Sequence, residues 1–216
     1  MQFALDEEEE MIRDAARRIA ADRLAPLAER LDRGEGRPEF LANLRELAAQ
    51  GFMAVNVRAE YGGTEAGTVA FALAIEELAY ACAATAVTAS VTNMVGEVVQ
   101  AVGSEEQRAL YLPRLADGTY PAGGFCLTES GAGSDPAGMT TRARRDGDGF
   151  VLDGAKLYIT SAEYAGLFVV WAVTDPAAPK GKGISCFLVE AGTPGLVIGK
   201  AEKKMGQTGS ATNTVH

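Results

Sequence analysis

The sequence predicts an α+β protein in which an N-terminal all-α helical bundle domain, residues 1–120, is followed by an antiparallel β-barrel or β-sandwich domain, residues 121–216. Two observations predict this order. In the first part, apolar residues recur every three or four positions, which is the period of a helix packed on one face. In the second part, short runs rich in β-branched and aromatic residues alternate with Gly, Pro and Asp, as they do in all-β domains.

The helical pattern is carried by three stretches and one capping sequence. Over residues 6–33 apolar side chains return at spacings of three and four, and residues 38–50 begin with proline, which favours the first turn of a helix. Residues 67–103 are almost all apolar or small, so their helices are expected at the centre of the bundle. Ser104 and Gln107 form a capping-box pattern, which predicts one more helix.

The strand pattern begins after Gly118. Asp153-Gly154 separates two apolar runs and predicts a hairpin, and Asp148-Gly149 marks another turn just before it. Such signals are typical of antiparallel sheets. Further strands are expected in three short runs, over residues 166–175, 183–191 and 194–200.

Composition and charge exclude several classes of protein. Hydrophobic residues make up 47% of the 216, and no apolar run approaches the roughly 20 residues of a membrane span. The first ten residues are acidic, where a signal or transit peptide would be basic, so we expect a cytoplasmic protein without a membrane segment. The net charge of −9 arises in residues 1–121, which hold 20 acidic and 11 basic residues. A partner nucleic acid is not expected, because it would require a basic surface.

The cysteines and the histidine restrict the chemistry further. Cys82, Cys126 and Cys186 lie far apart, so neither a disulfide framework nor a zinc site is expected, and a reducing compartment fits. The single histidine is His216. Triads that depend on histidine and His-rich metal sites are therefore excluded from these residues.

A glycine-rich stretch, "GAGSD" over residues 131–135, follows a predicted strand. Its free backbone N–H groups and the Ser134 hydroxyl suit a phosphate or pyrophosphate. The pattern differs from the dinucleotide fingerprint G-x-G-x-x-G in a βαβ unit. From residue chemistry alone, a structural turn and a ligand-binding loop are equally good interpretations.

A second stretch, "KLYITS" over residues 156–161, ends a predicted strand with one aromatic and two hydroxyl side chains. Tyr158 beside Thr160 and Ser161 is compatible with a planar heterocycle such as a flavin. An ordinary strand end with the tyrosine in the core is the simpler interpretation and is preferred on these residues alone.

The order and spacing of six motifs make the chain resemble the acyl-CoA dehydrogenase family over nearly its whole length. Together they are highly specific. They are "EELAYACA" (76–83), "GSEEQRALYLPRLADG" (103–118), "FCLTESGAGSDPAG" (125–138), "DGFVLDGAKLYITSAEYAG" (148–166), "GISCFLVEAGTPGL" (183–196) and "KMGQTGS" (204–210).

The resemblance implies a flavoprotein that buries FAD between an α-helical N-terminal domain, a middle β-domain and a C-terminal four-helix domain. In the family, the "FCLT" strand lies against the flavin ring, the glycine stretch contacts the pyrophosphate or the pantetheine arm of the substrate, and the second stretch shields the ring and bonds to flavin N5. The cofactor-binding residues implied here are Phe125, Leu127, Thr128, Gly133, Ser134, Tyr158, Ile159 and Thr160, with Tyr158 where tryptophan is common. Ser134 is also implied as a substrate contact.

The reaction implied is α,β-dehydrogenation of an acyl-CoA thioester to the trans-2-enoyl-CoA. A carboxylate removes the α-proton while the β-hydrogen leaves as hydride to flavin N5. The family's catalytic Glu lies in the C-terminal helical domain, beyond residue 216, so no catalytic residue is assigned here. Glu129 and Asp135 belong, by the resemblance, to the loop that organises the cofactor.

The acyl chain would lie along the helix expected after residue 84. Packing within the bundle is the preferred interpretation of its side chains, and substrate contact is the second. The candidate substrate-binding residues are Val87, Ser90, Val91 and Met94.

The family also implies partners: an acyl-CoA substrate, an electron-transferring flavoprotein as electron acceptor, and a homotetramer. Two alternatives stay open. A fold-related acyl-CoA oxidase or flavin monooxygenase would differ in how oxygen reaches the reduced flavin. A non-catalytic truncated paralogue would bind acyl-CoA or pair with a complete subunit, and a chain of this length would be inactive by itself.

Overall fold

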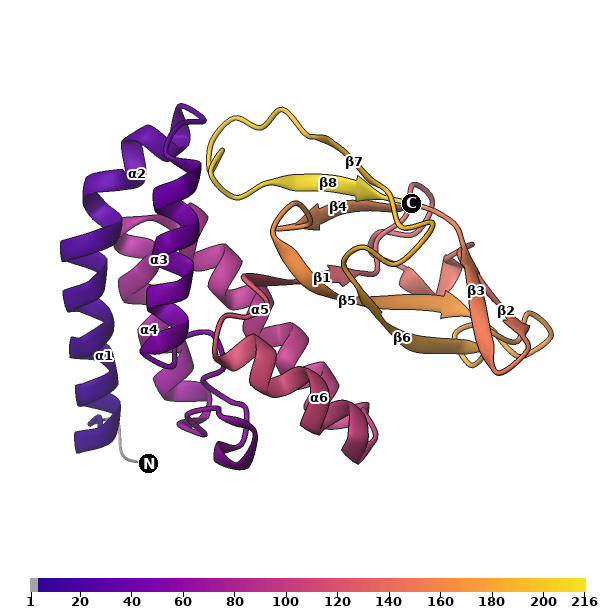
Figure 1. Cartoon of the computed structure of the whole chain (residues 1–216), viewed down its shortest axis with the longest axis horizontal. Helices are drawn as coiled ribbons and strands as arrows, with labels where there is room; N and C mark the ends of the chain where they lie inside the picture. The colour runs from indigo at the N-terminus through magenta and orange to yellow at the C-terminus, as the bar shows by residue number, and fades with distance from the viewer. Residues whose placement is uncertain (1–3) are drawn as a thin grey trace.

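The computed structural model describes residues 4–216, and Figure 1 shows a helical half beside a strand half. Helices followed by strands confirm the predicted fold class. The helices are α1 (Glu7–Ile19), α2 (Ala25–Asp32), α3 (Arg37–Ala49), α4 (Gly67–Ala81), α5 (Ala83–Val102) and α6 (Glu105–Ala116). The strands are β1 (Ala122–Cys126), β2 (Arg142–Asp146), β3 (Gly149–Asp153), β4 (Lys156–Thr160), β5 (Ala165–Val173), β6 (Ile184–Glu190), β7 (Ile198–Ala201) and β8 (Thr212–Val215).

The helix predicted over residues 6–33 is present but changes its hydrogen bonding midway. α1 begins with a capping box, in which Asp6 Oδ1 accepts from Glu9 N at 2.8 Å and Asp6 N donates to Glu9 Oε2 at 3.0 Å. One π-helical turn, Ala20–Leu24, then joins α1 to α2. Pro26 follows in the first turn of α2, where its missing N–H is tolerated. The capping box predicted at Ser104 and Gln107 is confirmed at the start of α6.

The two helices of residues 67–103 differ in burial. α5 is buried along most of its length, as the apolar sequence predicts. α4 packs on α1 and α5 through Ala70, Ala74 and Leu78, but Val69 and Tyr80 are 52% and 94% exposed. The expectation that both helices lie at the centre is therefore wrong for α4. A run of apolar and small residues does not indicate on how many sides a helix has neighbours.

The strands form two sheets. β1, β5, β2 and β3 are neighbours in the first sheet, with β6 also paired to β5, and the second sheet has the order β4, β8, β7. β1 runs parallel to β5, and β2 meets β5 in the same sense, so the first sheet is mixed. The parallel pairing is possible because three strands and their loops separate β1 from β5 along the chain.

The hairpin predicted around Asp153-Gly154 is wrong. β3 pairs instead with β2, across the turn next to Asp148, and β4 leaves to pair with β8 in the other sheet. A Cβ on Gly154 would lie 2.4 Å from Thr141 Oγ1. This glycine therefore permits a close approach to Thr141 where the chain crosses between the sheets. In the sequence, a glycine needed for close packing cannot be distinguished from a glycine needed for a turn.

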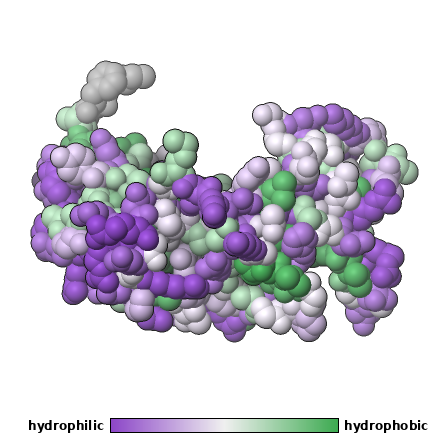
Figure 2. Space-filling model, turned by 90° about the horizontal axis from the view of Figure 1, so that it is seen from above, coloured by the Kyte–Doolittle hydropathy of each residue, from purple (hydrophilic) through white to green (hydrophobic). Residues whose placement is uncertain are grey.

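The two halves share a hydrophobic core. Val95 and Val99 of α5 and Leu112 of α6 pack with Leu167 and Val169 of β5. Residues 4–216 contain no helix that is both long enough and apolar enough to cross a membrane. Seen from above, apolar side chains gather mainly over the strand half, while hydrophilic ones dominate the helical half (Figure 2).

β1 lies unusually close to α5. A Cβ on Gly123 would approach the Val95 side chain to 2.8–2.9 Å, and Gly123 N donates to Thr92 Oγ1 at 3.1 Å. On the next residue, Gly124, a Cβ would lie 2.5 Å from the Phe168 ring. The adjacent glycines thus allow β1 to fit between a helix and the neighbouring strand.

Replacing Gly123 by Ala should lower the free energy of unfolding by about 1–3 kcal/mol, because the added methyl overpacks the contact with Val95. Chemical denaturation measures the change. Gly131→Ala is the matched control, since its Cβ would meet nothing within 4 Å in the described chain. Equal midpoints for the two variants would contradict the close approach.

Candidate functional site

The two stretches singled out in the sequence lie side by side. We call residues 125–129 the FCLTE segment and residues 156–161 the KLYITS segment. Leu157 N donates to Thr128 O at 2.8 Å, and Lys156 Nζ donates to Leu127 O at 3.1 Å. The fold therefore brings the end of β1 against the start of β4.

A buried ion pair also joins the segments. Lys156 Nζ lies 2.8 Å from Glu129 Oε1, with side chains only 3% and 5% exposed. The carboxylate also accepts from Thr140 N at 2.6 Å, Thr140 Oγ1 at 2.8 Å and Thr141 N at 3.0 Å. Burial by itself would raise the pKa of Glu129, but hydrogen bonds from Lys156, Thr141 and Thr140 outweigh it and lower the pKa to about 2. Such a carboxylate is a poor proton acceptor at neutral pH.

A bulge shapes the KLYITS segment. The pairing of β4 with β8 shifts register between Lys156 and Ile159, and Tyr158 has a φ of +58°. A regular strand would place Lys156 and Tyr158 on one face. The bulge instead turns both Lys156 and Ile159 inward, at 2% and 1% exposure, and leaves Tyr158 64% exposed. The expectation of a tyrosine in the core is wrong, and the Ile159 side chain is itself a core residue.

The remaining residues of the FCLTE segment are less buried. Phe125 is half-buried and packs its ring 6.3 Å from that of Trp171. Leu127 and Thr128 are also half-buried, and their carbonyls are the two acceptors that tie the segments together. Their positions leave part of each side chain open to a ligand.

The glycine stretch forms a tight turn, and most of its residues are exposed. Glu129 and Ala132 exchange backbone hydrogen bonds of 3.0 and 3.1 Å, and Ser134 is exposed. Neither Gly131 nor Gly133 has a positive φ, and a Cβ on either would meet nothing within 4 Å among residues 4–216. The fold itself does not require glycine at these two positions. Of the two interpretations left open, this favours the ligand-binding loop.

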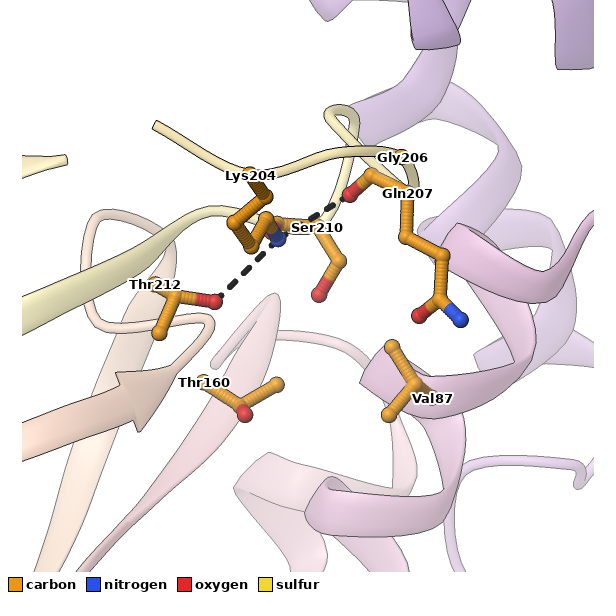
Figure 3. Close-up of a pocket in the computed structure, with 7 residues that line it drawn as sticks. All are labelled: Val87, Thr160, Lys204, Gly206, Gln207, Ser210 and Thr212. Atoms are coloured by element: carbon orange, nitrogen blue, oxygen red, sulfur yellow. Dashed lines mark hydrogen bonds between the residues drawn. The ribbon is translucent and has the colours of Figure 1, made fainter. Parts of the chain in front are cut away.

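A pocket of about 290 Å³ lies where the KLYITS segment faces α5 (Figure 3). Thr160 and Val87 line one side, opposite a loop that carries Lys204. Lys204 Nζ donates to Gln207 O at 3.0 Å, to Thr212 Oγ1 at 3.2 Å and to Ser210 O. Burial lowers the pKa of Lys204. The complete lining is Val87, Thr160, Lys204, Gly206, Gln207, Ser210 and Thr212.

The four candidate substrate residues form one stripe along α5. Their spacing of three and four places them on a single helix face, and none is buried. Met94 is 37% exposed, and Val87 alone of the four lines the pocket. Val87, Ser90 and Val91 are half-buried, so packing in the bundle, the interpretation preferred from sequence, and substrate contact both stay predictions for this stripe. The residues concerned are Val87, Ser90, Val91 and Met94.

Sequence reasoning missed several residues of the site. Lys156 was part of a recognised motif but had no role, and a lysine in a strand gives no signal that it is buried. Lys204, Gln207 and Ser210 belong to the "KMGQTGS" motif, whose place beside α5 depends on how the chain returns from β7 to β8 (Figure 1). Within the described chain, no group of three His, Cys, Asp or Glu residues could hold a metal ion.

Comparison with known proteins identifies the family. Residues 6–119 match the family model of the acyl-CoA dehydrogenase N-terminal domain, and residues 124–216 match that of the middle domain. The chain therefore belongs to the acyl-CoA dehydrogenase family.

Individual relatives agree with this assignment. The mitochondrial short/branched chain specific acyl-CoA dehydrogenase of Bos taurus is 41% identical over 207 residues, which cover 95% of this chain and 47% of that protein. A chain in a structure of the electron transferring flavoprotein of Acidaminococcus fermentans is 35% identical, with a TM-score of 0.93, over 100% of this chain and 56% of that one. An acyl-CoA dehydrogenase complexed with FAD from Bacillus anthracis is 32% identical, with a TM-score of 0.87, over 98% of this chain and 35% of that one. The chain thus spans about half the length of the bovine relative.

Acid should weaken the fold through Glu129. Its folded-state pKa of about 2 lies below the value of about 4.3 for a free glutamate, so its stabilising contribution is complete above about pH 5 and is lost as the pH falls toward 2. The change amounts to about 3 kcal/mol. Urea unfolding at several pH values measures it, as the difference between the wild type and the Glu129→Gln/Lys156→Met double variant.

The double variant keeps every other carboxyl group, so the difference between the two proteins isolates the titration of Glu129. A difference between the two proteins that stays constant from pH 7 to pH 2 would contradict the assignment of a low pKa to Glu129.

Proposed function

We propose that the protein is an FAD-dependent acyl-CoA dehydrogenase, which converts an acyl-CoA thioester to the trans-2-enoyl-CoA. One observation carries the proposal: Thr160, a candidate for the cofactor, and Val87, a candidate for the acyl chain, line the same pocket. We also propose that residues 1–120 and 121–216 are two domains, so that this pocket lies between them. Membership of the family and the FAD complex of the Bacillus anthracis relative support this assignment.

The residues present fit FAD. The Thr160 hydroxyl lines the pocket, the loop at Gly131 and Gly133 leaves open backbone for phosphate oxygens, and the exposed Ser134 can donate to them. When bound, FAD would supply a hydride acceptor at its N5 atom. The residues proposed to hold it are Phe125, Leu127, Thr128, Gly133, Ser134, Tyr158, Ile159 and Thr160, with Ile159 contributing through its backbone.

The chain's own residues would bind and orient the reactants. The exposed Tyr158 ring would shield the flavin from water, and the α5 stripe would contact the acyl chain. No carboxylate among the described residues lines the pocket, and the Glu129 carboxylate is occupied by Lys156. We therefore propose that the catalytic Glu lies beyond residue 216, as in the family pattern, and that residues 1–216 alone are inactive.

The proposed partners follow from the same assignment. They are an acyl-CoA substrate, an electron-transferring flavoprotein that accepts the electrons, and further copies of the subunit in a homotetramer. The match to a chain in a structure of an electron transferring flavoprotein supports the acceptor. The free cysteines Cys82, Cys126 and Cys186 support a reducing compartment, for which we propose the cytoplasm.

The reaction can be tested on the intact protein, as its gene encodes it. Acyl-CoA added without oxygen should bleach the bound flavin, and an electron-transferring flavoprotein should restore the flavin spectrum faster than dissolved oxygen does. Faster recovery with oxygen would indicate an oxidase or monooxygenase. Flavin that no acyl-CoA reduces, in a protein that raises the activity of a complete homologue, would indicate a non-catalytic partner.

Replacing Thr160 by Ala should raise the dissociation constant of FAD about tenfold, because it removes a hydrogen bond to the ring. Fluorescence titration measures the affinity, and the flavin absorbance spectrum reports the changed contact. Thr160→Ser is the matched control, since it keeps the hydroxyl. Equal FAD affinity in the alanine and serine variants would contradict the proposed hydrogen bond from the Thr160 hydroxyl to the flavin.

A further inference from the structure

The Lys156–Glu129 pair has no role in the proposed chemistry, although its burial is costly. Both side chains are almost fully buried, at 3% and 5% exposure, and their Nζ and Oε1 atoms lie 2.8 Å apart. Taking two charges out of water is unfavourable, and apolar replacements of such pairs are often neutral or stabilising. Stability alone therefore gives a weak reason for the pair. Its place in the structure suggests another reason.

The pair joins the two segments that would hold the flavin. Glu129 ends the FCLTE segment and Lys156 begins the KLYITS segment. Lys156 Nζ also donates to Leu127 O at 3.1 Å, so the ammonium group holds a backbone carbonyl from inside the segment that would touch the ring. Leu157, the residue after this lysine, donates its N–H to Thr128 O at 2.8 Å, so a second bond joins the segments at the same place.

Glu129 is fixed on its other side as well. Thr140 N and Oγ1 and Thr141 N all donate to its carboxylate, at 2.6, 2.8 and 3.0 Å. The loop before β2 therefore anchors the carboxylate, which in turn anchors the lysine. The bulge at Tyr158 completes the arrangement, because it lets Lys156 point inward while Thr160 still faces the pocket.

We propose that Lys156 and Glu129 are positioning residues, whose ion pair sets the separation of the FCLTE and KLYITS segments and so the geometry of the flavin site. This rests on the proposed function, because it assumes that the two segments hold FAD. Neither member of the pair lines the pocket that Thr160 and Val87 share. It acts through the Leu127 carbonyl and the backbone of Leu157.

The test uses the intact protein with the double variant Glu129→Gln/Lys156→Met. The glutamine oxygen can still accept from Thr140, and its NH2 group replaces the oxygen that contacts Lys156 and Thr141. Methionine keeps the volume of the lysine stem but cannot donate to Leu127 O. We expect a folded protein with an unchanged circular dichroism spectrum, an FAD dissociation constant raised about tenfold, and an altered flavin absorbance spectrum. A folded variant with wild-type affinity and spectrum would overturn the proposal.

The matched control is Arg17→Met/Glu77→Gln, which removes an ion pair between α1 and α4. Arg17 Nη2 lies 2.6 Å from Glu77 Oε1. This pair joins two helices and does not contact the FCLTE or KLYITS segment. FAD affinity should stay at the wild-type value. A tenfold loss in this control as well would show a general effect of destabilisation and would overturn the positioning role.

A milder variant decides the matter if the double variant does not fold. Thr140→Val removes one donor to Glu129 from an exposed residue and leaves the ion pair in place. A rise of about threefold in the FAD dissociation constant supports the proposal, and an unchanged constant overturns it. A wild-type protein that binds no FAD would refute the proposed function itself, whereas unchanged FAD binding in a folded double variant would refute this inference alone.

Discussion

The close contact of β1 with α5 is the constraint on which the rest of the site depends. Gly123 leaves no side chain between the strand and Val95, and Thr92 accepts its N–H from inside the helix. Because β1 leads directly into the FCLTE segment, its distance from α5 fixes where that segment lies relative to the stripe on the same helix. A side chain at Gly123 would move the proposed cofactor site away from the proposed acyl site.

Two buried polar interactions near this contact link segments that are distant in the chain. Ser161 Oγ donates to Thr88 Oγ1 at 3.2 Å, which joins the end of β4 to α5. Lys156 and Glu129 join β4 to the end of β1. A buried polar group without a partner is costly, so these pairings favour one arrangement of the two halves over others that would bury a similar apolar area. The hydrophobic core between the halves provides the attraction, and the buried polar pairs determine the relative arrangement of the halves.

Much of the fold could be predicted because the helices and their caps depend on residues that are close together in the sequence. The capping box at Ser104 and the helices of residues 6–33 and 38–50 follow from the spacing of a few residues. The predictions that failed concerned neighbours distant in sequence. Asp153-Gly154 has the sequence of a hairpin turn, but Gly154 lies beside Thr141 where the chain passes from one sheet to the other. α4 has the composition of a core helix, but one of its faces is exposed. Periodicity identifies an element and gives no information about what packs against it.

The sequence by itself determined the family, the order of helices and strands, and the two motifs proposed to hold the flavin, because these depend on residue identity and spacing. Only the tertiary structure decided that Lys156 is buried against Glu129, that Tyr158 points outward, and that Thr160 and Val87 line one pocket. The physical reason is that burial and ion pairing depend on distances across the fold. A single bulge in β4 reverses which side chains face inward, and no local pattern in "KLYITS" indicates that bulge.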